Sequence, residues 1–249
     1  MTEVLDVAKK DGRWTECPAC KEIIITKRLE KNLLVCPHCD FHFRLGGKER
    51  IALTCDDKGF VELDLATSSA ETRAKKLEKD FKGGMATIKG QTCVLGVMDF
   101  SVKGGSMGVD MAQNIITLMQ HAHKTARPLV MFCASGGVRV QEGIWGLLQM
   151  IRTVHARNTT ANIPMITVFT DPTLGGVTAS FSALADIILA EPGCRIGFAG
   201  PRVIEYTINY PLLPPDFQDA SRLLSNGFLD RIVHRHQLRD TLSYLLQWF

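Results

Sequence analysis

Cys-Pro-Ala-Cys at residues 17–20 and Cys-Pro-His-Cys at residues 36–39 decide the fold of the first part of this chain. Each pair presents two thiolates from one tight turn, and two such pairs at this separation are typical of a structural zinc ribbon. The predicted ligands are Cys17, Cys20, Cys36 and Cys39. Because four sulfurs close the tetrahedral shell of zinc, we expect the metal to stabilise the fold and to take no part in catalysis.

Little apolar sequence surrounds these cysteines, so the ribbon, expected over residues 13–43, needs its metal to fold. Between the cysteine pairs, residues 23–26 and 32–35 predict the two strands of a hairpin. Residues 46–56 predict a polar turn and a short helix. We therefore place the zinc ribbon and its connecting helix at residues 1–57, and a second domain at residues 58–249.

The composition limits the class of protein. The chain has 249 residues, room for one large domain or for a small domain joined to a medium one. Its net charge of +3 is too small to indicate nucleic-acid binding by itself. The other four cysteines are scattered, as in proteins of the reducing cytosol: Cys55, Cys93, Cys133 and Cys194. The first 16 residues lack the apolar core of a signal peptide, and no stretch reaches the length of a membrane span. We expect a soluble cytoplasmic protein.

The second part of the chain alternates apolar strand-like runs with helix-like segments. Strands are predicted at residues 92–100, 128–134, 163–170, 185–190 and 195–199, and helices at 110–125, 142–157, 177–184, 217–226 and 237–248. Near-continuous apolar strands alternating with helices indicate a buried, largely parallel α/β sheet. Residues 66–84 are polar and rich in Lys and Glu, which favours a linker or an exposed helix.

Three glycine pairs follow strands and precede helices in this region: Gly104-Gly105, Gly136-Gly137 and Gly175-Gly176. A glycine pair lets the backbone approach a ligand closely and point two N–H groups at one atom. Such donors form an oxyanion hole where no side chain supplies one. Each pair alone is more simply a tight turn with positive φ, but three pairs in equivalent positions favour a binding site.

Other catalytic arrangements have little support. Ser135 precedes a glycine but lies in no G-x-S-x-G elbow, and the histidines show no zinc-protease spacing. The G-x-G-x-x-G fingerprint of dinucleotide binding and the P-loop are both absent. Asp171 ends an apolar strand, where it could serve as a base, but an N-cap or turn role is more ordinary. Glu142 is placed where an acidic residue favours a helix N-terminus.

With these glycine stretches the chain resembles the β-subunit family of bacterial acetyl-CoA carboxylase carboxyltransferases. The resemblance lies in residues 14–20, 36–40, 104–108, 135–143, 170–177 and 196–205, which follow the order of the family and span nearly the whole chain. It implies an α/β fold, a crotonase-type ββα superhelix preceded by a small N-terminal four-cysteine zinc ribbon.

The resemblance also implies an activity: transfer of a carboxyl group from carboxybiotin to acetyl-CoA, giving malonyl-CoA for fatty acid or polyketide synthesis. The biotin is carried by a separate biotin carboxyl carrier protein and is carboxylated by biotin carboxylase. Two β subunits pair with two α subunits in an α2β2 heterotetramer, and each active site lies between an α and a β chain. The resemblance gives no membrane partner.

By the same resemblance, Gly175 and Gly176 line the oxyanion hole for the CoA thioester, and the α subunit supplies a second hole for the ureido oxygen of biotin. The substrate-binding surface is expected to include six further residues: Gly104, Gly105, Gly136, Gly137, Arg139 and Leu174.

The chain departs from the usual family pattern at three positions in two of these stretches. Val138 and Val140 replace Ala and Met, and Leu174 replaces Met beside the expected oxyanion hole. These changes suggest a specialised second copy that is insensitive to an inhibitor of the usual enzyme.

Other functions stay open on the sequence alone. One is a catalytically silent scaffold that still binds an α subunit, and another is an enzyme for a different acyl-CoA such as propionyl-CoA. A third is a nucleic-acid-binding zinc ribbon. Its small basic cluster of Lys27, Arg28 and Lys31 is diluted by Glu22 and Glu30.

Overall fold

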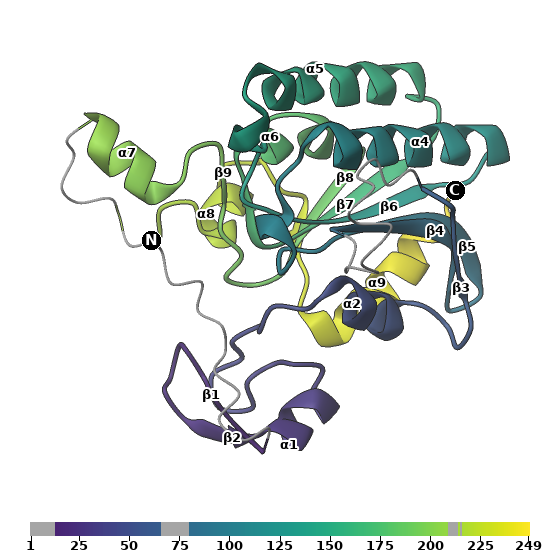
Figure 1. Ribbon diagram of the computed structural model, residues 1–249. Coiled ribbons are helices and arrows are strands. Elements are labelled where there is room, and N and C mark those ends of the chain that lie inside the picture. The colour runs from purple at the N-terminus through teal and green to yellow at the C-terminus, as the bar shows by residue number, and fades with distance from the viewer. Residues whose placement is uncertain (1–12, 66–79, 209–213, 215) are drawn as a thin grey trace, which may run out of the picture. The chain divides into compact units, whose positions relative to one another are not determined.

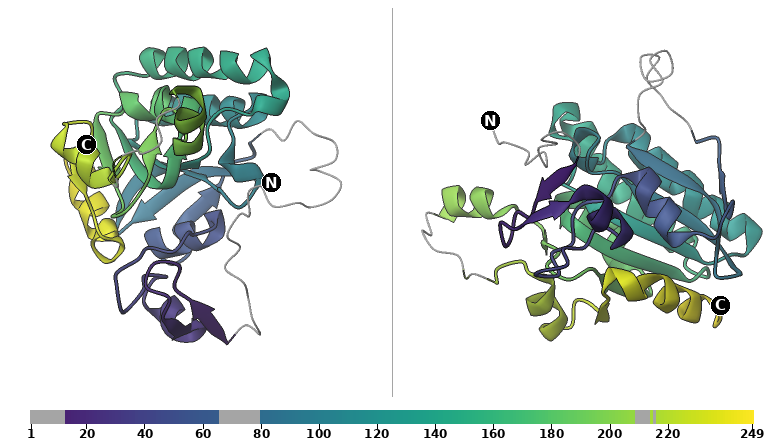
Figure 2. Two further views of the ribbon diagram at one scale, coloured as in Figure 1. Left: turned by 90° about the vertical axis from the view of Figure 1, so that its left-hand side faces the viewer. Right: turned by 90° about the horizontal axis from the view of Figure 1, so that it is seen from below.

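The computed structural model describes residues 13–65, 80–208, 214 and 216–249 (Figures 1 and 2). The chain forms two compact units, Met1–Leu45 and Gly46–Phe249. The helix expected at residues 46–56 is α2 (Gly47–Thr54), and it lies in the second unit, whereas we grouped it with the ribbon. Among the described residues, no helix combines the length and the apolar character needed to cross a membrane.

The ribbon unit is built around its first cysteine pair. Strand β1 (Trp14–Glu16) pairs antiparallel with β2 (Ile23–Ile25), so the turn of residues 17–20 itself connects the two strands, and helix α1 (Thr26–Lys31) follows. The predicted strand at residues 32–35 is wrong. Leu33 and Leu34 have φ values of 54° and 57°, in the left-handed region that a strand does not use.

The second unit contains an eight-stranded mixed sheet. Its path runs β10-β8-β7-β6-β5-β4-β3, and β9 pairs with β7. The strands are β3 (Phe60–Glu62), β4 (Phe81–Ile88), β5 (Gln91–Met98), β6 (Leu129–Ser135), β7 (Met165–Leu174), β8 (Ile187–Ala190), β9 (Ile196–Gly197) and β10 (Arg231–Ile232). Pairing from β5 to β10 is parallel, and β3, β4 and β5 pair antiparallel. The largely parallel α/β arrangement is confirmed, with strand ends shifted by a few residues.

The position of strand β4 shows that one prediction from the sequence is wrong in part. The composition of residues 66–84 predicts a linker or an exposed helix, but β4 begins at Phe81 and pairs along its length with β5. Residues 66–79 lie outside the described residues. The glycines misled the prediction, because Gly84 serves strand packing and not a turn. A Cβ on Gly84 would lie 2.2 Å from the carbonyl oxygen of Val61 on β3.

Helices cover both faces of the sheet (Figure 1). On one face lie α4 (Val109–Thr125) and α5 (Ile144–Thr159), and on the other lie α2 and α9 (Arg235–Leu246). The remaining helices are α6 (Gly175–Thr178), α7 (Pro201–Ile208) and α8 (Ala220–Ser225), with 3₁₀ segments η1 (Lys103–Gly105), η2 (Val140–Glu142) and η3 (Phe181–Leu184). The single helix predicted at residues 177–184 is therefore two short ones, α6 and η3.

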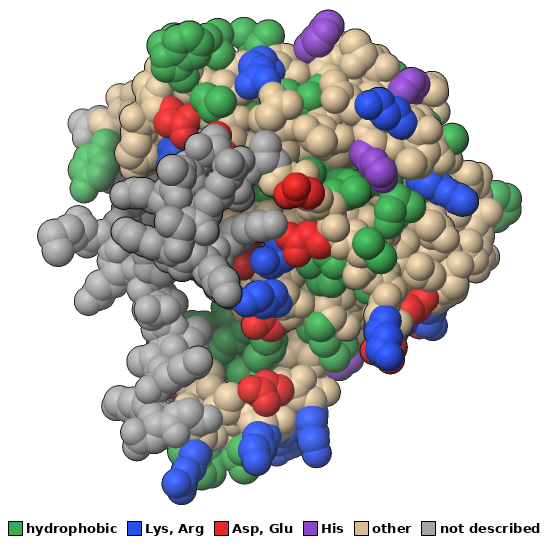
Figure 3. Space-filling model, turned by 45° about the vertical axis from the view of Figure 1, so that its right-hand side comes forward, with side chains coloured by type: hydrophobic (Ala, Val, Ile, Leu, Met, Phe, Trp, Pro, Cys, Tyr) green, Lys and Arg blue, Asp and Glu red, His purple; other side chains and the backbone are tan. Residues whose placement is uncertain are grey.

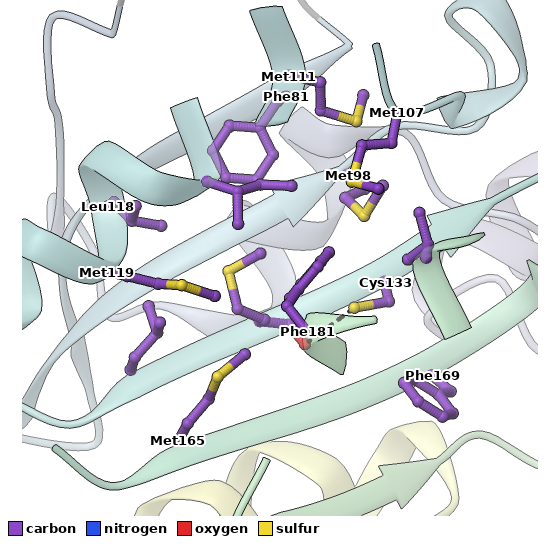
Figure 4. Close-up of a cluster of buried hydrophobic side chains, with 14 of the residues drawn as sticks. Phe81, Met98, Met107, Met111, Leu118, Met119, Cys133, Met165, Phe169 and Phe181 are labelled. Carbon is purple, nitrogen blue, oxygen red and sulfur yellow. Dashed lines mark hydrogen bonds between the residues drawn. The ribbon is translucent and has the colours of Figure 1, made fainter. Parts of the chain in front are cut away.

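The core lies on both faces of the sheet, because the buried strands alternate their side chains between them. On β6, Met131 and Cys133 join the cluster under α4, which Figure 4 shows with Phe81 and Phe181. Val130 and Phe132 on the same strand join the cluster under α9. Burial on both faces explains why these strands read as continuous apolar runs.

A buried ion triad lies on the α2 and α9 face. Both Arg50 of α2 and Arg235 of α9 bind Glu191, with N–O distances of 2.7 Å, and all three side chains are at most 5% exposed. The guanidinium of Arg50 also lies 4.9 Å from the ring centroid of Phe132. The triad ties the two helices to the residue that follows β8.

We expect Glu191→Gln to destabilise the second unit strongly, because it leaves two arginines without their buried counter-charge. Breaking a buried pair in this way costs about 3–5 kcal/mol. Asp240→Asn is the matched control, because it removes the exposed ion pair with Lys89 and should cost less than about 1 kcal/mol. Urea unfolding followed by circular dichroism measures both. Equal effects of the two variants would contradict a stabilising role for the triad.

Candidate zinc centre and glycine-rich site

The four predicted ligands meet in the ribbon unit. The sulfurs of Cys17, Cys20, Cys36 and Cys39 all lie within 4.8 Å of one another. The Cys17–Cys39 sulfur distance is 3.6 Å and the Cys20–Cys36 distance is 3.8 Å. Sulfurs at the corners of a tetrahedron with zinc–sulfur bonds of about 2.3 Å are about 3.8 Å apart, so the four residues fit a structural zinc ion.

The two cysteine turns have the same backbone design. In the first, Cys17 N donates to Glu22 O and Lys21 N donates to Cys17 O, each at 2.9 Å. In the second, Cys36 N donates to Phe41 O at 2.8 Å and Asp40 N to Cys36 O at 3.0 Å. This repetition presents the two sulfur pairs in equivalent ways to one point.

The negative charge of four neighbouring thiolates also requires a cation for stability. Burial raises the pKa of the Cys17 thiol, and the neighbouring Cys20 and Cys36 sulfurs raise it further, against the lowering effect of backbone N–H groups. Four thiolates this close would repel one another in the absence of a metal. Zinc supplies the positive charge that makes the cluster of thiolates stable.

We expect one zinc ion per chain, and we expect Cys36→Ser to abolish stoichiometric zinc binding. The free energy of zinc binding, about 10–16 kcal/mol in zinc-finger peptides, is also the folding free energy of such a unit. Cys55→Ser, which changes a cysteine outside the cluster, should keep its zinc. Metal analysis and a chromogenic chelator titration measure both. A wild-type chain that is free of metal and still has a folded ribbon would refute the assignment.

The glycine pairs lie at one edge of the second unit's sheet. They follow β5, β6 and β7, which are parallel neighbours, so their carboxyl ends meet at the same edge. Gly104 and Gly105 lie in η1, and Gly175 begins α6. Gly136 N donates to Gly104 O at 2.9 Å, so the first two loops are joined directly.

Ser135 fixes the loops through its hydroxyl group, a role that the sequence patterns did not predict. Its Oγ donates to Gly105 O at 2.7 Å and accepts from Gly137 N at 3.0 Å. The side chain is fully buried, which is unlike an attacking nucleophile. The signal in the sequence was a hydroxyl residue at the end of an apolar strand, directly before a glycine pair.

Gly137 and Gly175 meet backbone to backbone between the loops after β6 and β7. Their φ values are 118° and 65°, which favour glycine. A Cβ on Gly175 would lie 2.7 Å from Gly137 Cα, and a Cβ on Gly137 would lie 3.1 Å from Gly175 Cα. The first N–H groups of a helix have no acceptor within that helix, so those of Gly175 and Gly176 are not used within α6.

Gly176 needs its small size for a different reason. It is buried, and a Cβ there would lie 2.3 Å from Val138 Cγ1 and 2.9 Å from Met150 Sδ. The space beside Gly176 is therefore filled by the chain's own side chains. Leu174, two residues before Gly176, is half-buried and pairs with Gly197 of β9.

Arg139 and Glu142 support the loop after β6. Met107 N donates to Gly137 O at 2.8 Å and Arg139 N donates to Met107 O at 2.9 Å. The Glu142 carboxylate accepts from Val109 N at 2.8 Å and lies 3.8 Å from the Arg139 guanidinium. Glu142 thus binds the N-terminus of α4, although it precedes α5 in sequence.

Asp171, the other acidic residue considered from the sequence, is paired. Its carboxylate accepts from Arg195 Nε at 2.9 Å and from Arg195 Nη2 at 3.1 Å. This ion pair raises the pKa of Arg195, chiefly through the hydrogen bond. Because its carboxylate is paired with Arg195, Asp171 is better suited to fixing the loop before Gly175 than to acting as a catalytic base.

Two family models match the chain. Residues 44–218 match the carboxyl transferase domain, and residues 14–39 match the acetyl-CoA carboxylase zinc finger domain. The second match contains all four cysteines of the zinc centre.

Relatives match along nearly the whole chain. The acetyl-coenzyme A carboxylase carboxyl transferase subunit beta of Carboxydothermus hydrogenoformans is 46% identical over 96% of this chain and 90% of its own. A Natranaerobius thermophilus protein named as subunits beta/alpha is 42% identical over 95% of this chain, which covers 42% of that longer protein.

The fold is also found in a solved structure, that of transcarboxylase 12S. It has a TM-score of 0.72 at 23% identity, over 88% of this chain and 44% of the other. At this identity the likeness concerns the fold alone, and it agrees with the expected carboxyltransferase fold of the crotonase type. The chain has the family's zinc ribbon, and a relative is 46% identical over 96% of this chain. The chain therefore belongs to the family of acetyl-CoA carboxylase carboxyltransferase β subunits.

Proposed function

We propose that this chain is the carboxyltransferase β subunit of an acetyl-CoA carboxylase, and that it takes part in moving a carboxyl group from carboxybiotin to acetyl-CoA. The observation that carries the proposal is the contact between Gly137 and Gly175, where two loops of the family's sequence pattern meet backbone to backbone. Family membership over 96% of the chain supports the same activity.

The chemistry needs stabilised oxygens more than it needs a side-chain base. Removal of a proton from the acetyl methyl group of acetyl-CoA places negative charge on the thioester oxygen, and the resulting enolate attacks CO2 to give malonyl-CoA. Carboxybiotin, when bound, supplies the CO2 and a ureido nitrogen that accepts the proton. In our proposal the N–H groups of Gly175 and Gly176 donate to the thioester oxygen.

The rest of the site keeps these donors in position. Ser135 joins the loops after β5 and β6, and Gly137 leaves room for the turn at Gly175. We propose that Gly136, Gly137 and the η1 glycines border the acyl-CoA, and that Arg139 and Leu174 lie at the edge of its site. Zinc has a structural role in the ribbon, and biotin and acetyl-CoA reach the site as reactants.

The oxygen of the ureido group needs hydrogen-bond donors of its own. We propose that a related α subunit supplies them in an α2β2 heterotetramer, and that the carrier protein and biotin carboxylase complete the complex. The relative named as subunits beta/alpha supports an association of two such chains.

The other functions considered from the sequence are less favoured. An intact glycine site argues against a silent scaffold, and family membership across the ribbon argues against a nucleic-acid-binding module. Insensitivity to an inhibitor, which rests on Leu174 and Val138, stays a prediction. So do the preference for acetyl-CoA over propionyl-CoA and the cytoplasmic location.

We expect malonyl-CoA formation from acetyl-CoA and carboxybiotin only when the chain is assembled with its cognate α subunit. The expected rate for the chain alone is close to background, because half of each site is missing. Co-purification followed by a malonyl-CoA assay measures this. Full activity of a pure chain would refute the shared site, and an inactive assembled complex would refute the proposed reaction.

Gly176→Ala should lower the turnover of the assembled complex, because its Cβ displaces the loop from Val138. The largest decrease in turnover that we expect is that caused by the loss of one oxyanion donor, about a hundredfold to a thousandfold. Adding Val138→Ala removes the contacting Cγ1, and the flexible Met150 can move, so the double variant should recover most activity. Val138→Ala alone is the control and should be near wild type.

Assembly with the α subunit should be unchanged in all three variants, since the changes are local. If the double variant is no more active than Gly176→Ala, clearance from Val138 is not the reason for this glycine.

A further inference from the structure

Helix α5 exposes the side chains that an ordinary surface helix would bury. We define the α5 apolar face as six residues on η2 and the first two turns and a half of α5: Val140, Ile144, Trp145, Leu147, Leu148 and Ile151. Val140 is 76% exposed, Trp145 64% and Ile151 68%. On α5 their spacing of three and four residues puts them on one side of the helix.

The opposite side of α5 is buried and largely polar, and its polar groups are satisfied. Gln149 Nε2 donates to Trp145 O at 2.7 Å, and Thr153 Oγ1 donates to Gln149 O at 2.9 Å. Arg157 pairs with Asp186 at 2.8 Å. The helix is therefore held with its polar side inward, and its apolar side is left for another surface.

The exposure and charge of the face suit a subunit contact. Four of its six side chains are more than 60% exposed, and neighbouring exposed apolar side chains of this kind mark protein–protein contact sites. Arg152 turns away from it, donating to Gln149 and Gln113. Beyond Ile151 the outward residues are polar, His155 and Asn158.

The face is continuous with the glycine site. Val140 lies three residues after Gly137, and a Cβ on Gly146 of α5 would lie 2.6 Å from Arg139 O. On its inner side, α5 reaches Gly176 through Met150, whose Sδ would lie 2.9 Å from a Cβ there. In Figure 1 α5 is the outermost helix on its side of the sheet, and Figure 3 shows hydrophobic side chains gathered at the same end of the molecule.

We propose that the α5 apolar face is the docking surface for the α-type subunit, a related chain that presents an apolar surface of its own. The inference rests on the proposed function, in which a second chain completes the site. An occupant at this face would lie beside the loop of Gly137 and against the helix that backs Gly176. The relative with both subunits in one polypeptide favours an α-type chain over a second copy of this one.

The test compares Trp145→Arg and Ile151→Arg with the matched control His155→Arg, which adds the same charge to the polar end of the same helix side. The binding constant of each purified chain for its cognate α subunit is measured by sedimentation and by titration. Truncated interface tryptophans commonly cost enough to weaken binding about thirtyfold or more. We expect at least this loss for the two face variants and no change for the control.

Zinc content and the circular dichroism of the isolated variants report folding separately, and both should equal those of wild type, since the changed side chains are exposed. Unchanged α binding in Trp145→Arg and Ile151→Arg would overturn the docking surface while wild-type malonyl-CoA formation leaves the proposed function standing. Loss of α binding in the face variants, with no malonyl-CoA formed by the wild-type complex, would refute the function and keep the surface. A wild-type homodimer that the face variants convert to monomer would overturn the choice of occupant.

Discussion

The backbone contact between Gly137 and Gly175, at the carboxyl ends of β6 and β7, constrains the rest of the second unit. A Cβ on Gly175 would lie 2.7 Å from Gly137 Cα, so the two loops can approach only as glycines. The contact requires parallel neighbouring strands that end at the same level, which β6 and β7 provide. The helix that follows Gly175 then begins beside the loop after β6, and its first N–H groups lie at the site.

Several unrelated interactions keep this contact in place. Ser135 bonds both neighbouring loops, Glu142 ties the loop to the start of α4, and α5 packs against Gly176 through Met150. These residues would act by positioning backbone donors, and none needs to accept a proton from the substrate. An electrostatic site of this kind stabilises developing charge without reorganising during the reaction. It also leaves the chain dependent on a second subunit for the remaining donors.

The sequence predicted those features that local patterns determine. The spacing of four cysteines indicated the zinc centre, and apolar runs with glycine pairs indicated the parallel sheet and its site. Features that depend on distant partners were missed. Strand β2 pairs with β1 and not with residues 32–35, and Gly84 belongs to a strand because β3 passes close by. The triad of Glu191 and the outward apolar side of α5 depend in the same way on contacts between distant segments.

The proposed reaction depends on one interaction, the donation of hydrogen bonds by the backbone N–H groups of Gly175 and Gly176 to the thioester oxygen in a site shared by two subunits. Infrared spectroscopy of acetyl-CoA labelled with ¹³C at the thioester carbonyl tests it directly. We expect the carbonyl stretch to shift to lower frequency when acetyl-CoA binds the assembled complex, because hydrogen bonds polarise the carbonyl bond. A bound acetyl-CoA whose carbonyl frequency equals that in water or in an apolar solvent would contradict it.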